Sequence, residues 1–285
     1  MIKKIKILLD MIKFEHTIFA LPFAFVGAFL AQKKVPDLAT NFWILVAMAG
    51  GRTVAMAVNR IVDLHFDAKN PRTKDRPLVS GKVKKIEAWL MVIVAGFAFF
   101  IASYNLTPLA FKLSPFVLAI LVFYSYTKRF TAFCHLFLGF AIGIAPTAGW
   151  IAVKNSIDLL PLILSLGVMF WIAGFDILYA CQDVEFDKKE GLHSIPAAFG
   201  VKKAFLISGI FHAVAFFSFM ATGIIAGLNW VYFLGMAAIF IFLVLQRRVI
   251  TPEDLSKINI AFFRLNAAIS ITLFLATIIS LYMVT

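Results

Sequence analysis

Long runs of apolar residues, separated by short charged segments, dominate the chain. A helix that crosses a bilayer needs about 20 mostly apolar residues. On this basis we predict nine such helices, at residues 16–32, 41–62, 86–106, 113–127, 131–152, 159–181, 203–227, 229–247 and 258–284. The runs do not alternate with a period of two, and lipid cannot satisfy backbone polar groups, so helices are favoured over a barrel. The predicted fold is an all-α integral membrane bundle of nine transmembrane helices.

Basic residues in the connections indicate how the bundle is oriented. Residues 2–13 alternate basic and apolar positions at helical spacing, which predicts a helix lying along the membrane interface. Most Lys and Arg residues lie in this N-terminal segment and in the loops after the second, fourth, sixth and eighth predicted helices. The opposite side carries only Lys33, Lys34, Lys112 and Lys154. Because cytoplasmic loops are rich in Lys and Arg, we predict a multi-pass protein of the cell's inner (cytoplasmic) membrane with a cytoplasmic N-terminus.

Composition excludes several classes of protein. Of the 285 residues 62% are hydrophobic and only 15% are charged, against about 25% charged in an average soluble domain. A soluble enzyme, a disordered chain, a coiled coil and a disulfide scaffold are therefore excluded. The two cysteines, Cys134 and Cys181, have no metal-ligand spacing. The net charge of +12 is explained by membrane topology, so we expect no nucleic-acid partner.

The end of the second predicted helix and the end of the sixth are similar. The first reads NRIVDLHFD and the second reads DILYACQDVEFD, and a basic, polar segment follows each. This similarity indicates an ancient duplication. We therefore predict one domain over residues 1–285, built from two four-helix halves at 16–127 and 131–247 and a ninth helix.

These two helix ends hold six of the 15 acidic residues of the chain. Asn59, Asp63 and Asp67 are spaced by four, which places them on one face of a helix. Carboxylates at this spacing repel one another unless a cation lies between them. Oxygen ligands of this kind bind Mg²⁺, which commonly bridges to substrate phosphates. A single aspartate here would be read as an interfacial cap, but two matched clusters favour a metal site. The six residues are Asp63, Asp67, Asp176, Asp183, Glu185 and Asp187.

Asp176 and the nearby basic residues strengthen this interpretation. Asp176 lies inside the apolar run WIAGFDILYA, where an ionised carboxylate costs about 2.5–3.5 kcal/mol and requires a partner. Arg72 and Arg76 follow the first cluster, and Lys128 with Arg129 ends the fourth predicted helix. Taken singly, each basic residue is explained by topology. Together with the acidic clusters, they are typical of a site that binds a diphosphate through metal and arginine.

These motifs resemble the UbiA family of intramembrane prenyltransferases. The resemblance rests on N-x3-D-x3-D at 59–67, RT-x2-RPL at 72–78, D-x2-Y-x3-D-x3-D at 176–187 and YSYTKRFT at 124–131. It extends over essentially the whole chain. It implies a nine-helix bundle around a central cavity, capped on the cytoplasmic side by the two acidic loops.

The resemblance also implies roles for individual residues. Mg²⁺ and the diphosphate of a polyprenyl donor are expected at Asn59, Asp63, Asp67, Asp176 and Asp183. Further contacts to the diphosphate are expected from Arg72, Arg76, Tyr124, Lys128 and Tyr179. Arg52 matches an arginine that faces the carboxylate of an aromatic acceptor.

Arg52 is a candidate binding residue independently of this resemblance. It lies two turns before Asn59 inside an apolar helix, where an arginine requires an anionic partner. A structural pairing with a carbonyl or an aspartate is the alternative for it.

The mechanism that the resemblance implies is an electrophilic prenyl transfer. Mg²⁺ and basic side chains stabilise the departing diphosphate, which favours ionisation at the allylic carbon. An aromatic carbon ortho to a hydroxyl then attacks, and a base removes the ring proton. We expect catalytic roles for Asp63, Asp67, Asp176, Asp183 and Asp187, with Asp183 or Asp187 as the proton acceptor. Water must be excluded from the cation, and an apolar cavity does this.

The acceptor and the class of function leave alternatives open. Arg52 favours a carboxylate-bearing phenol, most simply 4-hydroxybenzoate for ubiquinone synthesis, and a naphthoate-type acceptor of menaquinone synthesis is the alternative. Glu15, His16 and His193 are candidates near the acceptor, with helix capping as the alternative; His65, His135 and His212 receive no role. A cation-coupled transporter is the alternative of another class, although transporter sites lie nearer the membrane midplane. A phosphatidyl-alcohol transferase would require a D-x2-D-G-x2-A-R pattern, which the sequence lacks.

Overall fold

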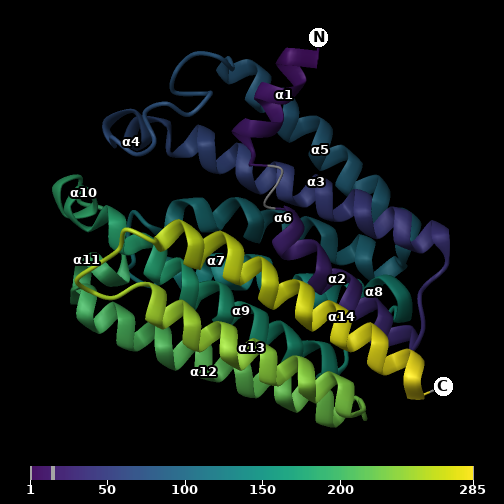
Figure 1. Cartoon of the computed structure of the whole chain (residues 1–285). Helices are drawn as coiled ribbons and strands as arrows, with labels where there is room; N and C mark the ends of the chain where they lie inside the picture. The colour runs from purple at the N-terminus through teal and green to yellow at the C-terminus, as the bar shows by residue number, and fades with distance from the viewer. Residues whose placement is uncertain (1, 14–16, 285) are drawn as a thin grey trace.

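The computed structural model describes residues 2–13 and 17–284, and all regular structure within them is helical (Figure 1). The first part of the chain forms α1 (Ile2–Met11), α2 (Thr17–Gln32), α3 (Leu38–Val62), α4 (Leu64–Lys69), α5 (Lys85–Leu106), α6 (Pro108–Thr127), α7 (Cys134–Gly143) and α8 (Ala145–Lys154). The second part forms α9 (Leu159–Ala180), η2 (Cys181–Asp183), α10 (Val184–Lys189), α11 (Ile195–Phe199), α12 (Val201–Ile225), α13 (Trp230–Val249), η3 (Ile260–Leu265) and α14 (Asn266–Val284). The all-α prediction is confirmed.

Eight helical segments of the described residues are long and apolar enough to cross a membrane. They correspond to the second to ninth predicted spans. The first predicted span corresponds to a shorter apolar stretch, Leu21–Gln32, within α2. The chain is therefore built as a multi-pass membrane bundle. The eight segments are Leu38–Val62, Lys85–Leu106, Pro108–Thr127, Cys134–Lys154, Leu159–Lys189, Val201–Ile225, Trp230–Val249 and Ile260–Met283.

Two of the predicted spans depart from the observed helices at a proline. The fourth span begins at Pro108 and not at 113, because Thr107 caps α6 by accepting a hydrogen bond from the Ala110 amide and proline is favourable in the first turn. The fifth span is interrupted between Gly143 and Ala145, where α7 ends and α8 begins. Pro146 lies in the first turn of α8 and has no N–H to continue the helix of α7.

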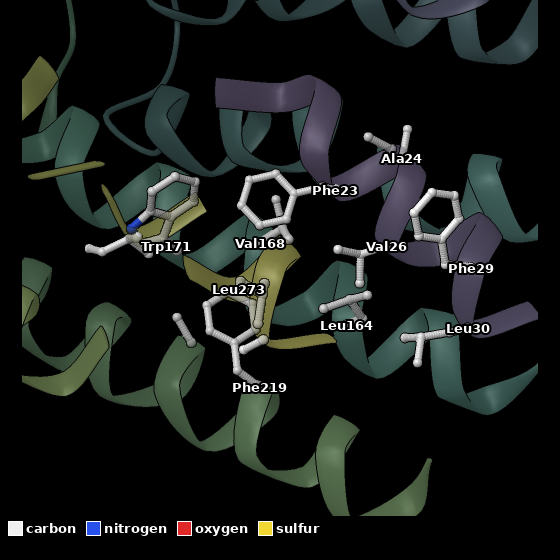
Figure 2. Packing of buried hydrophobic residues seen from close by; sticks show 14 of the residues in the cluster. Phe23, Ala24, Val26, Phe29, Leu30, Leu164, Val168, Trp171, Phe219 and Leu273 are labelled. Carbon is white, nitrogen blue, oxygen red and sulfur yellow. The ribbon is translucent and has the colours of Figure 1, made fainter. Parts of the chain in front are cut away.

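The main apolar core lies between α2, α9, α12 and α14. Figure 2 shows Phe23 of α2, Trp171 of α9, Phe219 of α12 and Leu273 of α14 within it. The rings of Phe23 and Trp171 are 5.2 Å apart and tilted, an arrangement that favours aromatic contact. In contrast, many large apolar side chains of α5, α6 and α12 point outward; Phe97 is 68% exposed. Such a surface fits lipid and not water.

The two acidic segments lie at the same end of the bundle. In Figure 1, α4 and α10 project from one end, and an ion pair of 2.7 Å joins Lys69 of α4 to Glu190 after α10. The helix α1 packs nearby, because Met11 and Ile12 are buried against Ala57 of α3 and Leu78 of the loop after α4. The long loop between α4 and α5 is thus covered by α1. These elements position the side chains of the candidate site.

Candidate active site

A cavity of about 780 Å³ lies between the two acidic segments. Helices α3, α6, α7 and α9, the loop after α4 and the end of α1 all contribute to its wall. Eleven of the twelve residues predicted for the site line this cavity, and Asp187 does not. The eleven are Arg52, Asn59, Asp63, Asp67, Arg72, Arg76, Tyr124, Lys128, Asp176, Tyr179 and Asp183.

The first acidic cluster keeps helical spacing across a break in the helix. Asp63 separates α3 from α4, yet its amide donates to the Asn59 carbonyl at 2.9 Å and its carbonyl accepts from the Asp67 amide at 2.8 Å. The Asn59 side-chain amide donates to Asp63 Oδ2 at 2.8 Å, and Arg129 donates to Oδ1 at 2.9 Å. Burial raises the pKa of Asp63, and the charge of Arg129 only partly opposes that rise. The carboxylate is therefore held by a side-chain amide and a cation.

Asp67 is held within its own loop. Its carboxylate forms an ion pair with Arg76, and its backbone carbonyl accepts a hydrogen bond of 3.0 Å from the Thr73 hydroxyl. Both contacts fold the chain after α4 back on itself. Arg76 and Asp67 therefore reach the cavity together.

Asp183 connects the second acidic segment to the loop that follows the first. Arg72 donates two hydrogen bonds to its carboxylate, from Nε at 3.0 Å and from Nη2 at 2.6 Å, and Asn70 adds a third at 3.1 Å. The Arg72 guanidinium also lies 5.2 Å from the centre of the Tyr179 ring. Burial disfavours the charge of Arg72, but the hydrogen bond and charge of Asp183 outweigh it and raise the pKa of this arginine. The bidentate pair fixes the two acidic segments relative to each other.

Asp187 is fully buried and supports Lys128 from outside the cavity lining. Lys128 Nζ lies 2.7 Å from Asp187 Oδ1, and the Ser194 hydroxyl donates to Oδ2 at 2.8 Å. Burial lowers the pKa of Lys128, but the charge of Asp187 outweighs that effect and raises it. Lys128 therefore stays protonated where it reaches the cavity.

Asp176 has a histidine as its partner. His135 Nδ1 lies 2.7 Å from Asp176 Oδ2, and the Ile195 amide donates to His135 Nε2 at 3.3 Å. The ring is 3% exposed, whereas the Asp176 side chain is 24% exposed and faces the cavity. The partner that the sequence requires for Asp176 is thus His135, a residue to which the sequence analysis assigned no role.

Arg52 lies where the polar cavity meets a second, apolar cavity of about 270 Å³. Its Nη2 donates to the carbonyl of Lys13, two residues after α1, at 3.2 Å, and its buried Nε has no hydrogen-bond partner among the described residues. Arg52 and Tyr124 line both cavities. A guanidinium with an unused donor at this boundary can bind an anionic group that enters from the polar side.

The arrangement of the carboxylates differs from the expected one in a specific way. The sequence predicts repelling carboxylates with a cation between them, whereas each aspartate is paired with a basic or histidine side chain. No three His, Cys, Asp or Glu side chains of the described part of the chain are grouped closely enough to hold a metal ion. The donor chemistry, carboxylates with an amide oxygen, nevertheless suits a hard divalent cation.

Sequence reasoning missed several residues of the site. Arg129 was noted only as a cation at the end of a helix, and Asn70 was not considered. The buried Arg60 was missed too; it donates from Nε to the Met11 carbonyl at 3.3 Å and from Nη1 to Asn59 Oδ1 at 3.2 Å. An arginine inside an apolar helix was a usable signal for it. Glu15 and His16 lie outside the described residues.

Comparison with known proteins identifies the family. The model of the UbiA prenyltransferase family matches residues 20–277. The 4-hydroxybenzoate octaprenyltransferase of Shewanella oneidensis is 30% identical over 239 residues, which cover 84% of this chain and 83% of that protein.

Solved structures agree with this result. The apo structure of a UbiA homologue from Aeropyrum pernix K1 is 36% identical, with a TM-score of 0.85 over 93% of this chain and 98% of the other. A UbiA homologue from Archaeoglobus fulgidus, bound to GPP and Mg²⁺, shares the fold with a TM-score of 0.69 at 20% identity over 95% and 99% of the two chains. The alternative of a cation-coupled transporter is therefore wrong. The chain belongs to the UbiA prenyltransferase family, and the protein is a multi-pass membrane prenyltransferase.

Proposed function

We propose that this enzyme transfers a polyprenyl group from polyprenyl diphosphate to an aromatic acid, 4-hydroxybenzoate, in a reaction that depends on Mg²⁺. The observation that carries the proposal is the junction of two cavities at Arg52 and Tyr124, one lined by carboxylates and cations and the other by apolar side chains. A diphosphate suits the first, an isoprenoid chain suits the second, and the reacting carbon then lies between them. Relatives named 4-hydroxybenzoate octaprenyltransferase support the choice of acceptor.

The basic side chains bind the donor diphosphate in this proposal. Arg72, Arg76 and Lys128 reach the polar cavity, and each is held in place by an aspartate. A planar guanidinium binds two phosphate oxygens at once, whereas a lysine acts as a point charge. When diphosphate enters, these cations exchange carboxylate oxygens for phosphate oxygens. Tyr124 and Tyr179 complete the wall around it.

Two of the aspartates released by this exchange, Asp67 and Asp183, are among the proposed metal ligands. Asp63, Asp67, Asp176 and Asp183, with Asn59, offer hard oxygen donors around one cavity. Bound Mg²⁺ would supply charge that stabilises the departing diphosphate. The Archaeoglobus fulgidus homologue is bound to GPP and Mg²⁺, which supports this choice of ion.

The acceptor is placed by Arg52. Its unused Nε and its position at the boundary of the two cavities fit the carboxylate of an aromatic acid. The hydroxylated ring is thereby directed toward the allylic end of the donor, and the apolar wall around it excludes water. Of the two carboxylates considered as the proton acceptor, Asp183 lines the cavity and Asp187 does not, which favours Asp183.

The membrane orientation is part of the proposal. We place the acidic segments, α1 and the polar cavity on the cytoplasmic side of the inner membrane, because the Lys and Arg residues of the connections gather there. The water-soluble diphosphate and acid groups then meet the site from the cytoplasm.

An acceptor screen tests the proposal. Purified protein in detergent is given geranyl or longer prenyl diphosphates with 4-hydroxybenzoate or a hydroxynaphthoate, with Mg²⁺ or with EDTA. Mass spectrometry should show a C-prenylated 4-hydroxybenzoate only with Mg²⁺. Preferential prenylation of the naphthoate would establish the alternative acceptor. Full turnover in EDTA would refute the proposed requirement for Mg²⁺.

Matched variants show that the product comes from this site. Asp183→Asn should form no prenylated product. Lys202→Ala should form the product as wild type does, because the side chain of Lys202 is 85% exposed and its ion pair with Glu253 spans 3.9 Å.

A further inference from the structure

We propose that His135 is a positioning residue which, as the neutral tautomer with its proton on Nδ1, holds the Asp176 carboxylate ready to receive the divalent cation. The inference rests on the proposed function, since it concerns the metal expected there. It starts from a buried histidine that lies outside every motif named in the sequence.

The tautomer is assigned by the hydrogen bonds on the two sides of the ring. Ile195 is the first residue of α11, so its amide has no partner within that helix. This amide donates to His135 Nε2 at 3.3 Å, which makes Nε2 an acceptor without a proton. A neutral ring then carries its proton on Nδ1 and donates it to Asp176 Oδ2, 2.7 Å away. An imidazolium would set two N–H groups against each other at Ile195.

The His135 ring is held by a hydrogen bond on each side, to Asp176 and to the Ile195 amide. Ser194 caps α11 by accepting from the Ala197 amide, and its hydroxyl donates to Asp187 at 2.8 Å. The His193 amide donates to the Lys128 carbonyl, also at 2.8 Å. The segment 193–195, which anchors His135, is thus hydrogen-bonded to the side chain of Asp187 and to the carbonyl of Lys128. This gives the Asp176 carboxylate a defined direction.

The consequence follows from comparing Asp176 with the other aspartates of the predicted site. Asp63, Asp67 and Asp183 are paired with arginines, and Asp187 with a lysine. Those permanent cations must move before a metal binds. A neutral imidazole leaves Asp176 its full negative charge, and only its Oδ2 is hydrogen-bonded among the described residues. Carboxylates that ligate metals are commonly oriented by such a hydrogen bond.

Asparagine and glutamine separate this role from mere packing. In His135→Asn the side-chain amide overlays Nδ1 and can still donate to Asp176, but the contact with Ile195 is lost. In His135→Gln the amide oxygen overlays Nε2 and accepts from Ile195, but the donor to Asp176 is lost. His65→Asn, at an exposed histidine, is the matched control.

Binding of Mn²⁺ alone, measured by electron paramagnetic resonance on folded protein, is the first readout. Removal of such an orienting hydrogen bond weakens metal affinity by roughly 10–100-fold. We expect that loss in His135→Gln and in Asp176→Asn, an affinity within a few-fold of wild type in His135→Asn, and no change in His65→Asn. Equal effects of the Asn and Gln variants at position 135, or no effect of either, would overturn the proposal.

The second readout is independent of metal and turnover. In protein labelled with ¹⁵N-histidine, the His135 signal, assigned by its absence from His135→Asn, should show a protonated Nδ1 and an unprotonated Nε2. A doubly protonated ring, or a proton on Nε2, refutes the inference. Failure of the proposed function would instead appear as absence of prenylated product from wild-type protein.

Discussion

Gly149 provides a sharp test of how the bundle is packed. A Cβ at this position of α8 would lie 1.9 Å from the Ala24 carbonyl oxygen of α2, and a Cβ at Gly27 would lie 1.9 Å from the Pro146 carbonyl oxygen. The two helices therefore touch through their backbones. Ala145 and Gly149 are four residues apart on α8, a spacing of small residues that is typical of close helix contacts in membranes.

The effect of Gly149→Ala can be worked out from this geometry. A carbon and a carbonyl oxygen approach to about 3.3 Å, so α2 and α8 must separate by about 1.4 Å. Overpacking of this kind costs about 1–3 kcal/mol, and the upper value applies because no side-chain rotamer relieves a clash with backbone. Alanine regains about 0.5–1 kcal/mol over glycine within a helix. The net loss of stability should be about 2 kcal/mol.

Gly96→Ala is the matched control, because it is also a helical glycine, and its Cβ would meet nothing nearer than a Val54 methyl at 3.8 Å. We expect it to gain about 0.5–1 kcal/mol. Cys134 and Cys181 are buried free thiols, so a thiol-reactive dye reports thermal unfolding in detergent. An unfolding temperature of Gly149→Ala equal to that of Gly96→Ala would refute the close crossing.

Four further predictions concern the site itself. Asp183→Asn should lower kcat by orders of magnitude while the protein stays folded, and near-normal turnover of this variant would contradict a catalytic role for Asp183. Asp187→Asn should raise the KM for prenyl diphosphate through Lys128 and spare kcat; a kcat loss equal to that of Asp183→Asn would instead make Asp187 catalytic. Arg52→Ala should raise the KM of the aromatic acid more than that of the donor, and an unchanged acceptor KM contradicts its assignment. Since burial raises the pKa of Asp63, this proposed ligand should bind a proton at higher pH than an ordinary aspartate does, and the Mn²⁺ concentration for half-saturation should rise as the pH is lowered below neutrality.

Much of the fold follows from the sequence because a bilayer imposes a simple rule on it. A segment long and apolar enough to cross must be a helix, so the all-α fold follows from hydropathy alone. The late start predicted for the fourth span and the break inside the fifth lie at Pro108 and Pro146, where a proline that starts a helix also reads as an ordinary member of an apolar run.

The contents of the cavity were predictable only in part. Spacing by four places Asn59, Asp63 and Asp67 on one face, and backbone hydrogen bonds preserve that register through the break at Asp63. The ion-pair partners of these carboxylates could not be predicted in this way, because Arg129 is 66 residues from Asp63, and Arg72 is 111 residues from Asp183. Such pairings depend on how helices pack, which no local pattern in a single sequence encodes.

The pairing of each carboxylate explains how the site tolerates its own charge before substrate arrives. Repulsion within an acidic cluster would destabilise the end of the bundle that carries α4 and α10. Arginine and lysine remove that repulsion in the ligand-free protein, and the same side chains are suited to phosphate oxygens.

In the proposed reaction, binding of a metal–diphosphate complex would replace the pairs Arg76–Asp67 and Arg72–Asp183 by new partners, metal for each aspartate and phosphate for each arginine. Neither charge of these two pairs would then be left buried alone, which is the situation that costs most. A carboxylate held by a neutral histidine would be the natural place for that exchange to begin, because it has no ion pair to break.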